Sequence, residues 1–385
     1  MTAMELLFGS ALGAIFYAFC GYPLLLALLA PLAGKGRKGP AAGAAAWPTV
    51  TLLISAHNEE AVLPGRLDNA LALDYPADKL SILVVSDAST DGTDEMVKGY
   101  AARNGRVGLL RQAERRGKSA ALNEAVAAAA GEIVVFSDAN SLYGRQALRE
   151  LVRPFADPRV GLVTGRTKYV AAGGARESAS LYSRLELWTK RNESRLGSCV
   201  GADGAIFACR RELYRPLAAD DLNDLVLPLR VVAQGRRAVL AGEAFCLEEE
   251  GRGGGEYQRQ IRIATRTLRA LARHRHLFSP RRRPWFAFQV ASHKVLKLML
   301  PFFMLLALLA SLALAGAGSS FYQTMLLLQG GGYALAAWGR LTGGRGRGPG
   351  AAYNLCLVAA AFLVGWAKWL AGETFTTWEQ QRLNG

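Results

Sequence analysis

The sequence predicts an α/β domain with a mostly parallel sheet, flanked by membrane-spanning helices. Two observations support this fold class. Long uncharged apolar runs lie at both ends of the 385-residue chain, whereas its middle alternates short β-branched runs with helical patterns. Short apolar runs bounded by polar residues suit strands that are buried on both faces, and the alternation of strands and helices is typical of a parallel sheet.

The first apolar run extends from about Leu6 to Ala33. It is longer than the ~20 residues that a spanning helix needs. Only the acidic Glu5 precedes the run, and basic residues follow it, which disfavours a cleaved signal peptide and favours an anchor with its N-terminus outside. We therefore expect a transmembrane helix over residues 1–33 and a basic linker over residues 34–48.

Three strands are predicted in the middle of the chain, at Val50–Ala56, Leu80–Asp87 and Glu132–Asp138. Helical patterns separate and follow them, over Glu59–Leu71, Asp94–Arg103 and Lys118–Ala130. Each strand ends in a polar cluster: His57–Glu59, Asp87–Gly92 and Asp138–Asn140. Because ligands of parallel sheets bind at the carboxyl ends of the strands, these clusters predict one crevice.

Three further apolar segments are expected within residues 295–371: Leu298–Gly316, a weaker one at Phe321–Trp338, and Ala351–Leu370. Four spans would place the C-terminal tail, residues 372–385, outside. That count fails if the Phe321 segment only re-enters the membrane. Residues 251–294 carry a basic cluster before these segments, and we expect them to form amphipathic helices at the membrane interface.

The formal net charge of +15 gathers beside the apolar runs. The positive-inside rule and anionic lipid headgroups produce this distribution, which predicts contact with membrane lipids. No nucleic-acid motif accompanies the charge, so we expect no nucleic-acid partner. The five cysteines form no CxxC pair, and neither they nor the four histidines have the spacing of a disulfide framework or a zinc site.

Several polar residues of the crevice have an ordinary alternative role. Asp87 could cap the helix that follows it, and Asp91 is expected to cap one, with Gly92 relaxing the turn. Asp138 directly follows an apolar strand, where a carboxylate needs a cation or solvent. The basic turn Arg115–Ser119 precedes a helix and could bind an anion, although a solvated run of charge would look the same.

Acidic and basic groups further along the chain also allow two interpretations. Asp220, Asp221 and Asp224 precede a helical pattern at Leu225–Val232, and one of them could cap it. Clustered carboxylates raise one another's pKa, which suits a general base. Four arginines recur at helical spacing, which a basic helix on the membrane surface would also show. They are Arg259, Arg262, Arg266 and Arg269.

The order of these motifs resembles that of the family 2 glycosyltransferases over roughly Val50 to Ile263. The motifs are His-Asn-Glu-Glu from His57, Ser-Asp-Ala-Ser-Thr-Asp-Gly-Thr from Ser86, Arg-Gly-Lys-Ser-Ala-Ala-Leu-Asn from Arg116, Phe-Ser-Asp-Ala-Asn from Phe136, Gly-Ala-Asp-Gly from Gly201, Asn223-Asp224, and Arg259-x-x-Arg262. Each motif is weak alone. Their shared order is the signal, and the apolar ends suit the membrane-anchored, synthase-like branch.

The resemblance implies a GT-A fold, a Rossmann-like and mostly parallel sheet, as a cytoplasmic catalytic domain over residues 49–250. It implies that Asp224 is the base that deprotonates the acceptor hydroxyl. It implies nucleotide contacts for the following residues, with Asp87 facing the base and Arg262 the diphosphate: Asn58, Glu59, Asp87, Lys118, Asp138, Arg259 and Arg262. It also implies a Mg²⁺ or Mn²⁺ cofactor held by Asp138 and Asn140.

Three departures from the family pattern bear on these expectations. Asn140 replaces the second acid of the Asp-x-Asp motif, which lowers the charge available to a metal. Arg259 and Ile263 replace the Gln and Trp of Gln-x-x-Arg-Trp, which weakens the case for a long-chain polymerase. Asp203 is an additional acid that could lie on the acceptor side or serve a turn.

The resemblance therefore predicts an inverting transferase of the inner (plasma) membrane that moves a sugar from a nucleotide-sugar, expected to be a UDP-sugar. The expected acceptor is lipid-linked or a polysaccharide, as in exopolysaccharide or glycolipid synthesis. Two alternatives stay open: a polyprenyl-phosphate sugar synthase that adds one sugar, and an inactive GT-A scaffold within a synthase complex. A homo-oligomer or a separate exporter is a further expected partner.

Overall fold

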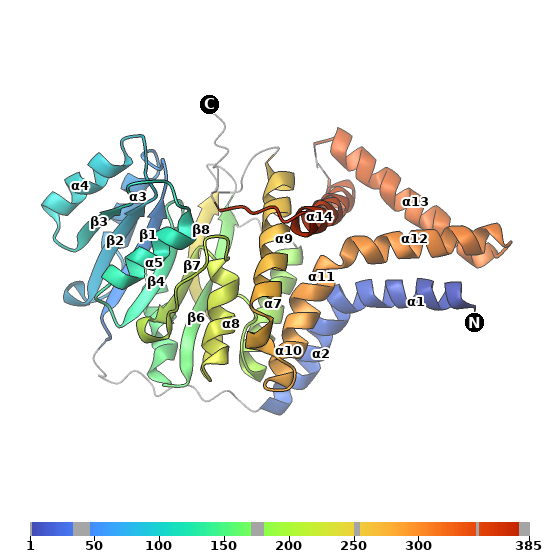
Figure 1. The fold of residues 1–385 in the computed structure, drawn as a ribbon, viewed down its shortest axis with the longest axis horizontal. Helices are drawn as coiled ribbons and strands as arrows, with labels where there is room; N and C mark the ends of the chain where they lie inside the picture. Colours follow the sequence, from blue (N-terminus) through green and yellow to red (C-terminus); the bar gives the residue numbers. More distant parts are fainter. Residues whose placement is uncertain (1, 34–46, 171–180, 250–254, 344–345, 377–385) are drawn as a thin grey trace. The chain divides into compact units, whose positions relative to one another are not determined.

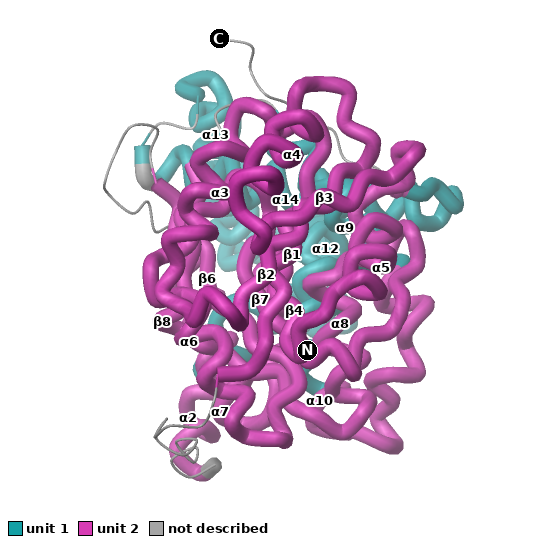
Figure 2. The backbone as a smooth tube through the Cα atoms, turned by 90° about the vertical axis from the view of Figure 1, so that its left-hand side faces the viewer, with its two compact units in different colours: residues 1–25, 253–269, 288–374 teal, residues 26–252, 270–287, 375–385 magenta. Residues whose placement is uncertain are grey.

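The computed structural model describes residues 2–33, 47–170, 181–249, 255–343 and 346–376. They form two compact units, shown in different colours in Figure 2. One unit contains the sheet and comprises residues 26–252, 270–287 and 375–385. The other is helical and comprises residues 1–25, 253–269 and 288–374. Most of the predicted linker at 34–48 and of the tail at 372–385 lies outside the described residues.

The sheet unit is built on eight strands in the order β3-β2-β1-β4-β7-β6-β8-β5 (Figure 1). Its first half is parallel and consists of β3 (Val107–Arg111), β2 (Leu80–Ser86), β1 (Val50–Ala56) and β4 (Ile133–Asp138). β1 is buried at every residue, as its unbroken apolar run predicts. The chain moves from β1 to β2 on one side and later to β4 on the other, which makes the β1–β4 border the switch point.

The second half of the sheet mixes directions. β7 pairs antiparallel with both β4 and β6, β6 pairs parallel with β8, and β5 pairs antiparallel with β8. The bounds of these strands are Leu142–Tyr143 for β5, Val160–Val170 for β6, Ile206–Arg210 for β7 and Arg237–Glu249 for β8. The mostly parallel α/β fold class predicted from the sequence is therefore confirmed.

Helices cover both faces of the sheet. α3 (Leu63–Leu71), α4 (Thr93–Arg103) and α6 (Ala147–Val152) share one core with side chains such as Leu52 and Ile82. α5 (Lys118–Ala128) and α8 (Asn223–Ala233) contact β1 and β6, respectively, while α7 (Leu181–Leu196) contacts β8. The three helices predicted between the first strands agree with α3, α4 and α5, although α3 begins four residues later than expected at Leu63.

The helical unit contains α1 (Ala3–Phe16), α12 (Leu300–Gly316), α13 (Ser320–Leu341) and α14 (Arg347–Leu370). α1, α12 and α13 share an apolar core around Phe8 and Ala310. The side-chain amide of Gln329 on α13 donates a hydrogen bond of 2.9 Å to Ser311 Oγ on α12. These contacts join α12 and α13, which are neighbours in sequence, and bring α1 against them from the other end of the chain.

Helices α2 (Tyr22–Leu29), α9 (Glu256–Arg273), α10 (Pro284–Val290) and α11 (Leu296–Leu298) complete the fold. Two helical stretches are long and apolar enough to cross a membrane, Ala3–Leu32 and Gly348–Leu370. The pair Pro284–Leu298 and Leu300–Gly316 would be a third, but it is bent by 60° and could be a broken span or a re-entrant loop. Among the described residues, α13 at the predicted third segment is not one of these apolar stretches, and the expected count of four spans stays a prediction.

Candidate functional site

The loops that follow β1 and β2 are interlocked at the carboxyl end of the sheet. Asn58 Oδ1 accepts a hydrogen bond of 2.8 Å from the Thr90 amide, and the Glu59 amide donates one of 2.8 Å to Thr93 Oγ1. Asn58 and Ala88 have positive φ angles of 56° and 53°. Non-glycine residues adopt this region at a cost, which surrounding contacts must offset, and such residues gather at functional sites.

Asp87 is 1% exposed and organises the turn before α5. Its carboxylate accepts the amide of Arg116 at 2.8 Å and the amide of Gly117 at 3.0 and 3.1 Å. Gly117 has a φ of 87°, which a side chain would disfavour. The anion at this helix N-terminus is therefore Asp87 itself, and its predicted contact with a nucleobase stays a prediction.

Asp91 bonds the first turn of α4, although the N-cap position expected for it is occupied by Gly92. Its Oδ1 accepts the Thr93 amide at 3.1 Å in the first turn of α4, and its Oδ2 accepts the Glu60 amide at 3.2 Å. Burial alone would raise the pKa of Asp91, but the hydrogen bonds from Thr93 and Glu60 outweigh it and the pKa is lowered.

Asp138 ends β4 beside the switch point and meets a cation, as its position predicts. The Lys118 ammonium at the start of α5 donates to Asp138 Oδ1. Asn140 follows two residues later and is exposed. Behind this edge lies Arg66, which is fully buried and donates to Ser137 Oγ at 3.0 Å. The sequence analysis did not single out Arg66, because a buried arginine on α3 has no local signal.

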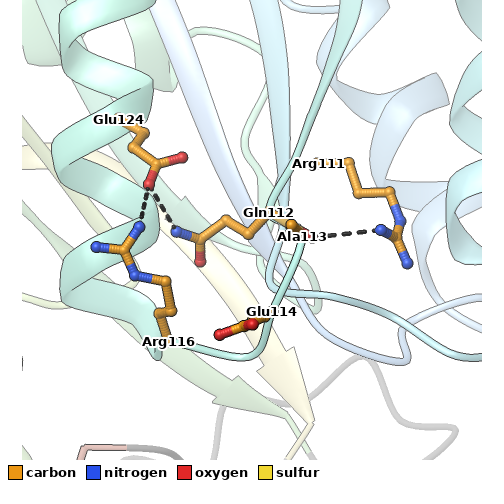
Figure 3. Close-up of a pocket in the computed structure, with 6 residues that line it drawn as sticks. All are labelled: Arg111, Gln112, Ala113, Glu114, Arg116 and Glu124. Atoms are coloured by element: carbon orange, nitrogen blue, oxygen red, sulfur yellow. Dashed lines mark hydrogen bonds and ion pairs between the residues drawn. The ribbon is translucent and has the colours of Figure 1, made fainter.

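A hollow of about 410 Å³ lies beside the Asp87 turn, between the end of β3 and α5 (Figure 3). Glu124 Oε1 accepts hydrogen bonds from Arg116 at 2.7 Å and from Gln112 at 3.2 Å. Gln112 is 2% exposed, and its Oε1 makes no hydrogen bond within the described part of the chain. Arg116 lines this hollow, and its backbone amide donates to Asp87. The hollow therefore lies next to the turn that leads to Lys118, the partner of Asp138.

Asp203 lies in the turn before β7, and both of its oxygens are engaged there. Oδ1 accepts from Thr167 Oγ1 at 2.7 Å and from the Ala205 amide at 3.2 Å, and Oδ2 accepts the Thr167 amide at 2.7 Å. These contacts supply the turn role that the sequence left open. A contact of Asp203 with an acceptor remains a prediction.

Asp224 begins α8 and faces the same turn. Its Oδ2 lies 3.4 Å from the position of a Cβ at Gly204, so the turn approaches the carboxylate closely. Asp224 Oδ1 is buried and has no hydrogen-bond partner among the described residues. A carboxylate oxygen held this way is unsatisfied in the protein alone and is available to accept a proton or a hydrogen bond from another molecule.

Lys190 on α7 is a partly buried cation that acts on this acidic region, and nothing in its local sequence marks it. Its ammonium lies 3.4 Å from the carbonyl oxygen of Ala202. Burial opposes its charged form, but Glu186, Asp203 and Asp224 together outweigh burial, and the pKa of Lys190 is raised. Lys190 therefore stays protonated and offsets the negative charge beside Asp224.

The acids that precede Asp224 serve a buried ion-pair cluster. Asp221 has no exposed surface, and its carboxylate lies 3.0 Å from His274 Nε2 and from Arg273 Nη1. The pKa of Asp221 is lowered, because His274, the Ala218 amide and Arg273 outweigh the effect of burial. Our expectation that these carboxylates raise one another's pKa is therefore wrong for Asp221, since sequence spacing does not show the cations that α9 supplies.

The helix α8 is also not capped by these acids. Its N-cap residue is Leu222, whose side chain makes no capping hydrogen bond. Asp221 Oδ2 instead accepts a hydrogen bond of 3.0 Å from the Ala218 amide, three residues earlier in the loop. The capping alternative for Asp220 and Asp221 is excluded by these contacts.

Glu248, near the end of β8, is a further residue that the sequence did not reveal. Ser141 Oγ donates to its Oε1 at 2.5 Å. Burial and the charge of Asp138 raise the pKa of Glu248 to about 7, and Asp203 adds to this effect. A strand acid in the run Glu248-Glu249-Glu250 gives no local sign that it faces a site.

Arg259 and Arg262 lie on α9, in the part of this helix that belongs to the helical unit. Arg259 pairs with Glu256 one turn earlier, at 2.6 Å. Further along α9, Thr265 Oγ1 donates a hydrogen bond of 3.3 Å to the Gly365 carbonyl oxygen, so α9 lies against α14. The predicted contacts of Arg259 and Arg262 with a diphosphate stay predictions.

The donor atoms at the end of β4 suit a hard divalent cation. Asp138 offers a carboxylate and Asn140 an amide oxygen, the ligand types that Mg²⁺ and Mn²⁺ prefer. Among the residues that the structure describes, no group of three or more His, Cys, Asp or Glu side chains is arranged to hold a metal alone. The site therefore fits a cation that a diphosphate helps to bind.

The sheet order, the switch point and the loops around it define an α/β domain of the GT-A type. The solved structure of the mannosyltransferase PcManGT from Pyrobaculum calidifontis, in complex with GDP-Man and Mn²⁺, is similar to it. The similarity covers 95% of this chain and 99% of that one, with a TM-score of 0.73 and 26% identity. Residues 51–217 match the family model described as glycosyl transferase family 2, the family whose motif order this part of the chain resembles.

Curated relatives agree with this assignment over part of their length. The probable glycosyltransferase YdaM of Bacillus subtilis is 33% identical over 216 residues, which are 53% of this chain and 51% of that protein. The beta-monoglucosyldiacylglycerol synthase of Synechocystis sp. is 34% identical over 122 residues, 31% of this chain and 26% of that protein. The poly-beta-1,6-N-acetyl-D-glucosamine synthase of Staphylococcus aureus is 32% identical over 120 residues, with 31% and 28% covered. This chain therefore spans between about a quarter and half of the length of these relatives.

Proposed function

We propose that this protein transfers a sugar from a nucleoside diphosphate sugar to an acceptor held at the membrane, with inversion at the anomeric carbon. The observation that carries the proposal is the buried Oδ1 of Asp224, which has no hydrogen-bond partner among the described residues and lies in the same sheet unit as the Lys118–Asp138 pair. The Asp224 carboxylate suits a general base, and the Lys118–Asp138 pair suits the binding of a diphosphate. Both are needed for a displacement at a glycosyl carbon.

The transfer step assigns one task to each group. The acceptor hydroxyl gives its proton to Asp224 while its oxygen forms a bond to the anomeric carbon. The bond from that carbon to the diphosphate oxygen breaks, and the nucleoside diphosphate leaves. Lys190 offsets the charge of Asp224 before proton transfer, and Lys118 lies where it can donate to the leaving diphosphate.

A divalent cation at Asp138 and Asn140, when bound, would offset negative charge on the leaving diphosphate. Mg²⁺ and Mn²⁺ both suit these oxygen ligands. The Mn²⁺ in the complex of PcManGT supports a divalent cation in the present protein as well. Arg262 is proposed to reach the same diphosphate from α9, with Arg259 beside it.

The nucleoside is proposed to extend from Asp138 past the Asp87 turn toward the hollow at Gln112 and Glu124 (Figure 3). Asn58 and Glu59 border this path through the loop after β1. Gln112 Oε1 and the Glu124 carboxylate are hydrogen-bond acceptors, which suit the N–H groups of a base edge. We expected a UDP-sugar from the motif order, whereas PcManGT binds GDP-Man, so both bases belong in the first experiment.

The acceptor is proposed to be a lipid or a growing polysaccharide at the inner membrane. The apolar stretches Ala3–Leu32 and Gly348–Leu370 support membrane attachment, with the sheet unit on the cytoplasmic side. Two of the relatives are named for a glycolipid and a polysaccharide product. An acceptor bound at the bilayer surface fits both kinds of product.

The test is a screen of UDP- and GDP-sugars for nucleotide release by the detergent-solubilised protein, with Mn²⁺ and membrane lipids present. We expect one donor class to give lipid-dependent release, and Asp224→Asn to lower the rate about 10²- to 10⁴-fold, the usual contribution of a general base. The exposed Asp78 gives a matched control, since Asp78→Asn should leave the rate unchanged. Unchanged turnover by Asp224→Asn would remove the assignment of the base.

Product length separates the remaining possibilities. A single added sugar indicates a lipid-sugar synthase, of which a polyprenyl-phosphate acceptor is one form, and a ladder of products indicates a polymerase. Absence of donor turnover with every sugar, together with unchanged cellular product from Asp224→Asn, would favour an inactive scaffold.

A further inference from the structure

The metal motif of this chain has lost one carboxylate, and the fold brings another beside it. We propose that Glu248 supplies the second carboxylate of the divalent-cation site, in place of the acid that Asn140 lacks. The inference rests on the proposed function, since it takes the donor diphosphate as the other partner of the cation.

Strand pairing places Glu248 next to the motif. β5 begins at Leu142, two residues after Asn140, and pairs antiparallel with β8 through Leu142–Leu247 and Tyr143–Cys246. The hydroxyl of Ser141, which directly follows Asn140, donates to Glu248 Oε1 at 2.5 Å. Ser141 and Glu248 are 107 positions apart in the sequence. The hydrogen bond between them holds Glu248 against the residue that directly follows Asn140.

Glu248 belongs to the same group of charged side chains as Asp138. Asp138 and Asp203 both act on Glu248 through space, and Lys118 acts against them. Asp138 and Asp203 also have cations of their own beside them, Arg66 and Lys190, respectively. Glu248 instead accepts its hydrogen bond from the uncharged hydroxyl of Ser141, which leaves this acid suited to a further cation.

Two of these carboxylates retain oxygens for such an ion. Asp203 uses both of its oxygens in hydrogen bonds with Thr167 and Ala205. Within the described part of the chain, no hydrogen bond engages Asp138 Oδ2 or Glu248 Oε2. Glu248 is only partly buried, so its free oxygen can meet a ligand from solvent.

The negative charge of the ligands matters more to this cation site than their number. An amide oxygen can coordinate Mg²⁺ or Mn²⁺, but it adds no negative charge. The pair Asp138 and Glu248 restores the two charges that an Asp-x-Asp motif would give. The diphosphate and water then complete the coordination.

The experiment measures Mn²⁺ affinity of the intact, detergent-solubilised protein by the loss of the free Mn²⁺ electron paramagnetic resonance signal, with GDP or UDP present and no sugar. We expect Glu248→Gln to weaken Mn²⁺ binding by about 10-fold or more. Asn140→Asp combined with Glu248→Gln returns a carboxylate to the motif and should recover most of the affinity. Glu249→Gln, at the exposed next position, is the matched control and should bind as the parent does.

Equal Mn²⁺ affinity of the parent and Glu248→Gln would overturn the inference, and so would an equal loss in Glu249→Gln. Thermal melts show whether Glu248→Gln is folded. If it is not, Glu248→Asp keeps the charge but withdraws the carboxylate by one methylene, and unchanged affinity in that variant overturns the inference equally. No sugar is transferred in this assay. Failure of the proposed function would therefore show in the donor screen and would not change the measured Mn²⁺ affinities.

Discussion

His274 Nε2 lies 3.0 Å from each carboxylate oxygen of Asp221, a side chain with no exposed surface. Ser119 at the start of α5 donates to the Asp221 carbonyl oxygen at 2.8 Å. The pair therefore joins the C-terminal end of α9 and the first turn of α5 to the loop that leads into Asp224. We infer that it holds the predicted base in position without touching a substrate.

The first prediction concerns the stability of this pair. The pKa of Asp221 is lowered in the folded protein, so the pair stabilises the fold above the unfolded pKa of about 3.9 and loses this effect as pH falls through the folded pKa. We expect Asp221→Asn to lower the free energy of unfolding by about 3–5 kcal/mol at pH 7, the cost of breaking a buried pair. The difference should shrink below about pH 4, in denaturant melts between pH 3 and 7.

An exposed ion pair gives the control for this experiment. Glu95 pairs with Lys98 on α4, and both side chains are mostly exposed, at 72% and 62%. Glu95→Gln should change the free energy of unfolding by less than about 0.5 kcal/mol. If Asp221→Asn were as mild as this control at pH 7, the positioning role of the pair would be wrong.

The second prediction concerns the turn held by Asp87. Asp87→Ala removes the acceptor for the amides of Arg116 and Gly117 in a place with almost no solvent. We expect it to lower the free energy of unfolding by about 1–3 kcal/mol. Because the same turn positions Lys118, nucleotide affinity measured by calorimetry should fall about 10-fold with GDP or UDP. Wild-type affinity in a folded Asp87→Ala protein would contradict this role.

The third prediction tests helix packing in the helical unit. A Cβ at Gly339 would clash with the Pro349 carbonyl oxygen of α14, whereas one at Gly331 would meet nothing within 4 Å. Gly339→Ala should therefore lower thermal stability in detergent, by about 1–3 kcal/mol of overpacking. Gly331→Ala on the same helix should be neutral or slightly stabilising, because alanine favours helix. Equal effects of the two substitutions would show that α13 and α14 do not approach as described.

The fourth prediction separates Lys190 from the nucleotide-binding groups. Lys190 faces Asp203 and Asp224, and the nucleotide path is proposed along Lys118. Lys190→Met should lower kcat about 10-fold and change the KM for the donor little, whereas Lys190→Arg, which keeps the charge, should recover part of kcat. Lys98→Met, at an exposed position, is the control. A rise in donor KM with kcat unchanged would place Lys190 on the nucleotide side instead.

The parallel half of the fold could be predicted because its signals are local. β1 occupies Val50–Ala56, the bounds that the apolar run predicted, and the end of β4 at Asp138 also agrees. Strand order along a parallel sheet brings the loops after such strands to one edge, whatever the rest of the chain does. The interlocking of Asn58 with Thr90 follows from that geometry.

The antiparallel half and its side chains could not be predicted in the same way. Glu248 meets Ser141 across 107 residues, and Asp221 meets His274 across 53. Neither pair has a spacing that local chemistry would mark, since strand pairing and helix packing alone bring them together. The misjudged pKa of Asp221 has the same origin, because its cations come from α9.

The sequence by itself determined the fold class, the resemblance to a family and the acids at the strand ends, because buried strands and ordered motifs are properties of short segments. The tertiary structure decided how those acids are used. It turns Asp87 and Asp203 inward to hold turns, leaves Asp224 Oδ1 without a partner among the described residues, and brings Glu248 beside Asn140. The reason is physical: the charge and hydrogen bonding of a carboxylate depend on neighbours that only the folded chain supplies.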